Sequence, residues 1–340
     1  MPASSGSRLA DRIRRTPRPC AAPFEGNLIT GPSRRADPLP TSAESASTAG
    51  GSALIGLLRT MRPRQWVKNV LVFAAPIASG RVLDLDVGRS SMIAFALFCL
   101  VSSGVYLIND VRDAQEDRRH PVKRFRPVAA GVTPVRAAVA AGVVLLVGSL
   151  VGAAVVGNFA LASVLGTYVA ISLAYSFFLK VQPVLDLAAV ASGFLLRAVA
   201  GGAAAGIPLS QWFLLVTSFG ALFMVAGKRY AELVALGDTG QTRRSLREYS
   251  QSYLRFVWSL SAAVACMTYS LWAFEMREAA DGFPWQVLSI APFVLALLRY
   301  AVDVDRGAAG APEEIVLGDR VLLMFGGVWL TFFGLGVWLS

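Results

Sequence analysis

The sequence predicts an all-α polytopic membrane protein with about nine transmembrane helices. Of its 340 residues, 55% are hydrophobic and only 16% are charged, whereas charged residues make up about 25% of ordinary soluble domains. The mean hydropathy is +0.55. The apolar residues also gather in runs long enough to cross a hydrocarbon core about 30 Å thick.

Nine apolar runs are the candidate spans, and each is long enough, or nearly so, to cross the membrane. One of them contains Gly193 and the pair Gly201-Gly202, which permit close packing of neighbouring helices. In chain order the runs lie near residues 68–83, 90–109, 135–156, 158–179, 184–206, 210–227, 253–274, 286–302 and 321–339.

The net charge of +10 is distributed unevenly between the loops. The segment before the first run and the loops 110–134 and 228–250 are rich in lysine and arginine, whereas the alternate loops carry only Arg81, Arg89 and Arg277. The positive-inside rule places the basic loops and the amino terminus in the cytoplasm. Nine spans then put the carboxyl terminus outside. Because the basic residues follow this topology, we expect no nucleic-acid partner.

Two segments differ in composition. Residues 1–50 are rich in serine, proline, alanine and arginine and lack apolar periodicity, so we expect a disordered cytoplasmic extension. Residues 51–340 are predicted to form one helical membrane domain. It starts with a short interfacial helix at 53–60, followed by Trp66, which suits the headgroup layer.

The few cysteines and histidines exclude several kinds of site. Cys20, Cys99 and Cys266 are odd in number and far apart, so no disulfide framework or zinc site is indicated. His120 is the only histidine, which excludes a histidine-based metal site and a Ser-His-Asp triad.

An acidic cluster follows the second apolar run. Asp110, Asp113 and Asp117 recur at i, i+3 and i+7, which places them on one helical face. Like charges repel at that spacing, and a divalent cation would remove the repulsion. Ligands that are all oxygen suit Mg²⁺, which usually shares its coordination shell with substrate phosphates. The cluster therefore predicts a Mg²⁺ site for a diphosphate-bearing substrate at the membrane surface, with a solvated acidic helix end as the alternative.

Basic residues lie on both sides of this cluster in the sequence. Lys68 belongs to the segment 62–69, which either anchors the first span at the membrane surface or binds an anion. Lys123 and Arg126 follow the cluster. They are either ordinary cytoplasmic loop charge or groups that screen the metal and hold anionic substrate oxygens.

Polar residues also interrupt later apolar runs. Asp186 and Arg197 are about three helical turns apart and share a face. Arg197 lies so deep in its run that it must face the bundle interior or a polar cavity, and a buried Asp–Arg or Arg–carbonyl pair is the structural alternative. Lys228 either pairs with Glu232 at i+4 or joins Arg229 in binding a second phosphate.

The chain resembles the UbiA-type intramembrane prenyltransferase superfamily over residues 55–340. The resemblance rests on the Asn109-Asp110 motif, the Lys123–Pro127 stretch, the Tyr175 region and about nine spans. It implies a central cavity that opens to the cytoplasm and sideways to lipid, between two aspartate-rich motifs. Where the second motif is expected, this chain has Lys228-Arg229-Tyr230-Ala231-Glu232. That departure, together with the Arg62–Asn69 stretch, resembles the decaprenyl-phosphate phosphoribosyltransferase branch.

This branch transfers phosphoribose from phosphoribosyl diphosphate to a polyprenyl phosphate, which supplies arabinose donors for cell-wall arabinan. The resemblance implies a Mg²⁺-dependent pentosyltransferase in the cell (inner) membrane, multi-pass, with its active site facing the cytoplasm. The 5-phosphate of the donor and the lipid phosphate are extra anions, which favour cations over carboxylates at the second motif. The oligomeric state stays open, with a homo-oligomer such as a trimer compatible with this reading.

The expected roles follow from charge. The lipid phosphate oxygen is already anionic, so the transfer needs no general base. Asp110, Asp113 and Asp117 are the expected catalytic and metal-binding residues, and Asn109 orients the diphosphate. The other substrate-binding candidates are Lys68, Lys123, Arg126 and Lys180 for the lipid phosphate or diphosphate, Lys228 and Arg229 for the 5-phosphate, and Tyr175, Asp186 and Arg197 for the cavity wall and ribose.

Two alternatives remain. A prenyltransferase using prenyl diphosphate and an aromatic acceptor should have an acidic second motif, which this chain lacks. A membrane transporter should have charges spread across the bilayer. Here nearly all charges cluster on the predicted cytoplasmic side.

Overall fold

Long apolar helices make up the described part of the chain. The computed structural model describes residues 53–156, 158–236, 248–278, 282–307, 315 and 318–339. No strand occurs among these residues, and eight helical segments are long and apolar enough to cross a membrane, so the all-α polytopic fold is confirmed. They are α3 (Leu85–Arg112), α5 (Val135–Val155), α6 (Phe159–Phe177), α7 (Leu185–Ala205), α8 (Gln211–Leu236), α9 (Gln251–Glu278), α10 (Trp285–Leu288) continued by α11 (Ile290–Asp305), and α13 (Arg320–Trp338).

The first apolar run differs from the single long helix predicted near 68–83. It forms a 3₁₀ helix, η1 (Pro63–Phe73), followed by the short helix α2 (Ala74–Ala78). A 3₁₀ helix rises about 2.0 Å per residue, so the 11 residues of η1 extend about 22 Å, and α2 adds about 7.5 Å. Together they match the membrane core although neither is a long α-helix. The count of nine crossings depends on this broken segment and stays a prediction.

A close backbone approach accompanies the tighter winding of η1. A Cβ added to Gly201 of α7 would overlap the backbone oxygen of Val72 in η1, so only glycine allows this contact. Side chains of η1 also bond to α3: Trp66 Nε1 donates to Ser103 Oγ at 3.1 Å, and Asn69 Nδ2 donates to Ser102 Oγ at 3.4 Å. η1 therefore lies wedged between α3 and α7.

Two apolar clusters form most of the core, and α7 contributes to both. The first joins η1, α3, α5, α6 and α7 through residues such as Phe98, Leu165 and Ala200. The second joins α7, α8, α9 and α11 through residues such as Leu187 and Trp258. A polar side chain on α7 can therefore reach neighbours in either half of the bundle.

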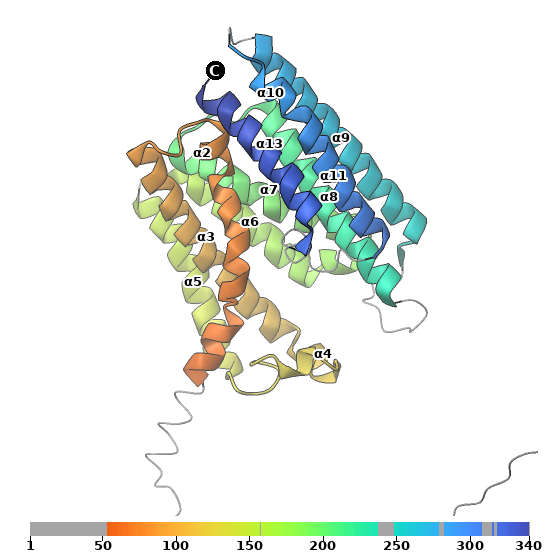
Figure 1. The fold of residues 1–340 in the computed structure, drawn as a ribbon. Coiled ribbons are helices and arrows are strands. Elements are labelled where there is room, and N and C mark those ends of the chain that lie inside the picture. The colour runs from red at the N-terminus through yellow and green to blue at the C-terminus, as the bar shows by residue number, and fades with distance from the viewer. Residues whose placement is uncertain are drawn as a thin grey trace, which may run out of the picture. The chain divides into compact units, whose positions relative to one another are not determined.

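The two ends of the bundle carry different chemistry. Trp338 Nε1 at the end of α13 donates to the carbonyl of Gly80 at 3.1 Å, so the carboxyl-terminal end of α13 lies beside the turn after α2. At the other end Arg62, just before η1, meets Asp110 near the end of α3. Figure 1 shows η1 in orange running between these ends, with α10 near one end and α4 (Ala114–Arg119) at the other.

The predicted interfacial helix at 53–60 is helical. It exposes Leu54, Ile55 and Leu58, as expected for a helix lying against a membrane surface. The predicted extension 1–50 lies outside the described residues, and the division of the chain at residue 50 stays a prediction.

Candidate active site

A polar cavity lies toward the α4 end of the bundle, where α3, α6 and α7 meet η1. Its volume is about 240 Å³. Three cations contribute to its wall, Arg62, Lys68 and Arg197, together with the amide of Asn109. The remaining lining side chains are mostly hydroxyl-bearing or apolar: Val105, Tyr106, Tyr168, Ser172, Tyr175, Ser176, Ala189, Val190 and Phe194. Such a wall suits an anionic, polyhydroxylated ligand.

Two of the predicted aspartates share one arginine. Arg126 Nη1 lies 2.8 Å from Asp117 Oδ2 and 3.3 Å from Asp110 Oδ1. Arg62 Nη2 lies 2.6 Å from the same oxygen of Asp110. Asp110 and Asp117 are both buried, so these guanidinium groups compensate charges that would otherwise be costly to desolvate.

The third aspartate turns to a different set of partners. Helix α3 ends at Arg112, so Asp113 is the junction residue before α4. Its carboxylate accepts from Lys180 Nζ at 2.7 Å and from Asn109 Nδ2 at 3.3 Å. Ser176 Oγ donates to Asn109 Oδ1 at 3.0 Å, which fixes the orientation of the Asn109 side-chain amide. The three carboxylates therefore do not form the single row that the i, i+3, i+7 spacing predicts.

The oxygen donors suit Mg²⁺ in kind but lie in two groups. Among the described residues, no three acidic, cysteine or histidine side chains are gathered to hold a metal ion. Mg²⁺ usually binds one or two carboxylates and completes its shell with water and substrate phosphates. The pair Asp110 and Asp117, or Asp113 beside Asn109, meets that smaller requirement. The carboxylates become available to the metal when Arg126 or Lys180 binds a substrate phosphate instead. The residues fit a metal held jointly with substrate.

Arg197 is held as the sequence requires for a charge deep in the bundle. Its Nε donates to Asn69 Oδ1 at 2.8 Å, its Nη1 to the Gly193 carbonyl at 2.6 Å, and its Nη2 to the Tyr168 hydroxyl at 3.2 Å. The guanidinium carbon also lies 5.3 Å from the centre of the Phe98 ring. Arg197 therefore makes the predicted contact with a backbone carbonyl, and it also lines the polar cavity.

Asp186 points away from Arg197, toward α8 and α9. It is fully buried, and its Oδ2 lies 3.5 Å from Arg229 Nε. Arg229, rather than Lys228, pairs with Glu232, at 3.1 Å. Arg229 Nη2 donates to the Tyr175 hydroxyl at 3.4 Å. Asp186 and Arg229 are thus not among the residues that line the cavity, but Arg229 contacts the lining residue Tyr175.

The structure brings most of the predicted site residues into one region. Lys68, Asn109, Tyr175 and Arg197 line the polar cavity directly. The three aspartates, Arg126 and Lys180 are connected to its lining residues through one to three hydrogen bonds. Lys123 in η2 (Lys123–Phe125) and the half-buried Lys228 of α8 are not among the lining residues.

Sequence reasoning missed several cavity residues. Arg62 stood out only as part of a basic segment, and its contact with Asp110 joins residues 48 positions apart. Tyr106, Ser172 and Ser176 are ordinary members of apolar helices. One signal was available: Tyr106 and Asn109 are at i, i+3, and Ser172 and Tyr175 are too, so each pair shares a helix face.

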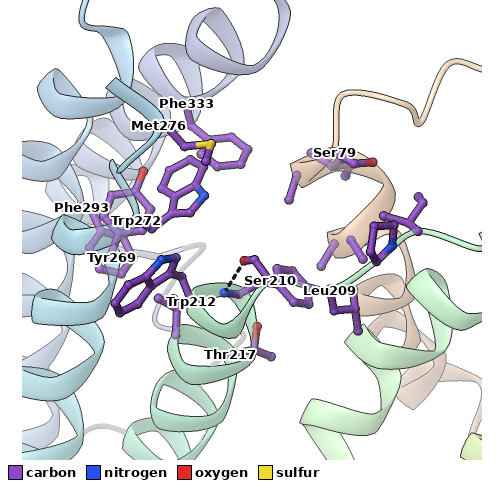
Figure 2. A pocket seen from close by; sticks show the side chains of 18 of the residues that line it. Ser79, Leu209, Ser210, Trp212, Thr217, Tyr269, Trp272, Met276, Phe293 and Phe333 are labelled. Atoms are coloured by element: carbon purple, nitrogen blue, oxygen red, sulfur yellow. Dashed lines mark hydrogen bonds between the residues drawn. The ribbon is translucent and has the colours of Figure 1, made fainter. Parts of the chain in front are cut away.

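A second, larger cavity of about 460 Å³ lies toward the Gly80 end of the bundle (Figure 2). Aromatic side chains of α8, α9, α11 and α13 form one side, with Trp212, Tyr269 and Trp272 among them. Residues of α2, the adjacent Ser79 and the α7–α8 connection, which includes Leu209, form the other side. The η1–α2 segment borders both cavities, the polar one at Lys68 and the apolar one from Ala74 to Ser79.

Related proteins match the chain over most of its length. A protein of Mycolicibacterium smegmatis named decaprenyl-phosphate phosphoribosyltransferase is 50% identical over 314 residues, covering 88% of this chain and 98% of the relative. A protein of the same name from Corynebacterium glutamicum is 49% identical over 280 residues, covering 81% of this chain and 84% of the relative.

Solved structures match the fold. A UbiA homologue from Archaeoglobus fulgidus, solved with GPP and Mg²⁺, superimposes with a TM-score of 0.61 at 18% identity, covering 83% of this chain and 98% of that one. The model of the UbiA prenyltransferase family matches residues 70–325, which contain seven of the nine predicted crossings completely and most of the polar cavity. This chain is therefore a member of the UbiA prenyltransferase family of multi-pass membrane enzymes.

Proposed function

We propose that this enzyme transfers 5-phosphoribose from phosphoribosyl diphosphate to a polyprenyl phosphate such as decaprenyl phosphate. The bond from ribose C1 to the diphosphate oxygen breaks, a bond from C1 to a lipid phosphate oxygen forms, and diphosphate leaves. The observation that carries the proposal is the polar cavity with three cations in its wall, beside an acidic motif whose carboxylates are paired with further cations. The shared name of two relatives at 49–50% identity supports it.

The acidic motif is proposed to hold the diphosphate leaving group through Mg²⁺. Asp110, Asp113 and Asp117 would supply carboxylate oxygens, and Asn109, fixed by Ser176, would orient the diphosphate. Bound Mg²⁺ would stabilise the negative charge that builds on the leaving group. Arg126 and Lys180, which now neutralise the carboxylates, would then be free to bind the phosphate oxygens that bring the new negative charge.

The acceptor is proposed to bind through cations around the same cavity. Lys68 lies in the cavity wall, and Lys123 and Arg126 belong to the loop after α4. A phosphate monoester is already anionic at neutral pH, so its oxygen attacks ribose C1 without losing a proton to the protein. The absence of a histidine from the cavity wall agrees with such a reaction.

The rest of the donor is proposed to lie against α6, α7 and α8. Tyr175 and Arg197 present a hydroxyl and a guanidinium to the cavity, where ribose hydroxyls would bind. Lys228, on α8 next to Arg229, is the candidate for the 5-phosphate. Because Arg229 is already engaged by Glu232 and Tyr175, its proposed contribution to that site is through its neighbours.

The apolar cavity offers a place for the hydrocarbon chain of the acceptor. A polyprenyl phosphate combines an anionic head with a long apolar tail. The η1–α2 segment links a cation-lined cavity near one end of the bundle to an apolar cavity near the other. We place the acceptor along this segment, with its phosphate toward Lys68 and part of its chain toward Trp212.

The enzyme is proposed to reside in the cell (inner) membrane with the acidic motif on the cytoplasmic side. The basic loops at the Asp110 end support this orientation. The donor is a water-soluble sugar phosphate, so an opening on the cytoplasmic side would give it access without crossing the membrane.

A transfer assay tests the proposal. Purified full-length protein in detergent is supplied with Mg²⁺, polyprenyl phosphate and phosphoribosyl diphosphate labelled in the ribose. We expect Mg²⁺-dependent transfer of label into the organic phase. If no label transfers but labelled prenyl diphosphate alkylates an aromatic acid, the enzyme is a conventional prenyltransferase and the proposal is wrong. If neither reaction occurs in folded protein, a transport function becomes the better account.

A further inference from the structure

Tyr249 lies just before α9 and reaches across to the connection between α6 and α7. Its side chain is buried. The hydroxyl accepts a hydrogen bond from the Val184 amide at 2.6 Å and donates one to Asp186 Oδ1 at 2.5 Å. One side chain thereby bonds to both the last residue of this connection and the first turn of α7.

The connection needs such support. Val184 has a φ of +68°, a strained backbone conformation that is rare for a β-branched residue. A buried hydrogen bond to its amide helps to hold that conformation. The same connection contains η3 (Leu179–Val181), where Lys180 reaches Asp113 at 2.7 Å. The backbone that Tyr249 holds therefore carries one of the cations of the proposed active site.

A second route runs from Tyr249 through Asp186. Oδ1 of Asp186 accepts from Tyr249, and Oδ2 faces Arg229 Nε. Arg229 in turn donates to the hydroxyl of Tyr175, which lines the polar cavity. Asp186 is fully buried and Arg229 is 6% exposed, so this chain of contacts is shielded from solvent. Its step from Asp186 to Arg229 is an ion pair at 3.5 Å without a hydrogen bond, and burial strengthens that charge interaction.

We propose that Tyr249 is a positioning residue, whose hydroxyl fixes Lys180 through the Val184 backbone and Tyr175 through Asp186 and Arg229. It touches neither cavity. On the proposed function, its role is to pre-form the part of the site that binds phosphoribosyl diphosphate. Asp186 and Arg229 then act through Tyr175 rather than by contacting ribose themselves.

The protonation of Tyr249 agrees with this role. Burial, reinforced by the hydrogen bond to Asp186, raises the pKa of the phenol above its ordinary value. The hydroxyl therefore keeps its proton, and its hydrogen bond to the carboxylate, throughout the pH range in which a membrane enzyme is assayed.

A matched pair of substitutions tests the inference. Tyr249→Phe removes the hydroxyl and keeps the ring, which stacks on Tyr253 with centroids 5.7 Å apart. Tyr253→Phe is the control, because the Tyr253 hydroxyl has no hydrogen bond within the described residues and the side chain is 37% exposed. Both variants of the full chain are compared with wild type by hydrogen–deuterium exchange of the peptide spanning 178–187 and by donor kinetics.

We expect exchange in this peptide to be about tenfold faster in Tyr249→Phe, since the Val184 amide loses its acceptor and Asp186 loses a donor. We expect KM for phosphoribosyl diphosphate to rise about tenfold while kcat changes much less, because the site is misplaced before the donor binds. Tyr253→Phe should match wild type in both measurements. Loss of folded protein alone would lower the apparent kcat and leave KM unchanged.

The inference is overturned if Tyr249→Phe matches Tyr253→Phe in either measurement. Asp186→Asn, which keeps the acceptor oxygen and removes the charge facing Arg229, should raise KM in the same direction. If wild-type protein transfers no phosphoribose, the proposed function fails separately, and the exchange comparison still decides whether Tyr249 holds the connection.

Discussion

Each carboxylate of the acidic motif meets at least one cation of the protein. Arg62 and Arg126 meet Asp110, Arg126 also meets Asp117, and Lys180 meets Asp113. These pairs neutralise the motif where α3 ends, at the edge of the apolar part of the bundle. On the proposed function, an anionic substrate that binds together with Mg²⁺ would exchange partners with these pairs, so the same residues would balance charge with and without substrate.

At this scale the central prediction concerns Asp113. Asp113→Asn keeps the shape of the side chain but removes its charge, which weakens both the proposed Mg²⁺ site and the contact with Lys180. We expect the rate of lipid labelling to fall at least about 100-fold, with thermal unfolding near that of wild type. Glu116→Gln on α4 is the control, because Glu116 is exposed and should tolerate the change. Normal turnover in Asp113→Asn would exclude a role for Asp113 in metal binding.

Arg197 makes a different prediction, about stability. Lysine cannot reproduce the three directed bonds to Asn69, Gly193 and Tyr168, and it would leave buried acceptors without donors. We expect Arg197→Lys to lower the free energy of unfolding by about 1–3 kcal/mol, seen as a lower melting temperature in detergent.

Arg81→Lys is the matched control for Arg197→Lys. Arg81 pairs with Asp84 in an exposed position, so the change should cost less than about 1 kcal/mol. Equal melting temperatures for the two variants would mean that the Arg197 bonds add little to stability.

Local sequence patterns predict the elements well where they are apolar and long. Eight of the nine apolar runs form long α-helical segments near the predicted positions. The first run does not, because its winding depends on a contact with α7 that lies far away in the sequence. Nothing in residues 68–83 indicates that the Val72 carbonyl will pack against Gly201.

This contact gives the prediction at the scale of elements. Gly201→Ala places a methyl group where the Val72 backbone lies, so η1 must move away from α7. We expect a marked loss of thermal stability and, because Lys68 is on η1, of transfer activity. Gly220→Ala on α8 is the control: a Cβ there meets no atom within 4 Å, and alanine favours helix by about 1 kcal/mol. Similar melting temperatures for both variants would contradict the wedged placement of η1.

The site was predictable only where a residue stands out in its local sequence. Lys68, Asn109, Tyr175 and Arg197 stand out as polar residues in or beside apolar runs, and all four line the cavity. The partners of Asp186 were not predictable, since Tyr249 and Arg229 come from two other segments. The spacing of residues within one helix shows which of them share a face, but it does not show which other helices or loops pack against that face.

For the whole molecule, the ends of the bundle predict an orientation. Glu116 is exposed at the Asp110 end, and Leu83 is 80% exposed near Gly80 at the other end. In intact cells we expect a membrane-impermeant maleimide to label Leu83→Cys and to label Glu116→Cys only after permeabilisation. The unsubstituted protein measures the background from its three native cysteines. The reverse labelling pattern would place the acidic motif outside the cell.

The transfer of an intact phosphoribosyl group is the most direct test of the account. Phosphoribosyl diphosphate is prepared with radiocarbon in the ribose and radiophosphorus on the 5-phosphate, and incubated with the enzyme, Mg²⁺ and polyprenyl phosphate. We predict that both labels enter the lipid in the ratio they have in the donor, while unlabelled diphosphate appears in the aqueous phase. Lipid that gains ribose without the 5-phosphate, or gains neither label, would contradict the account.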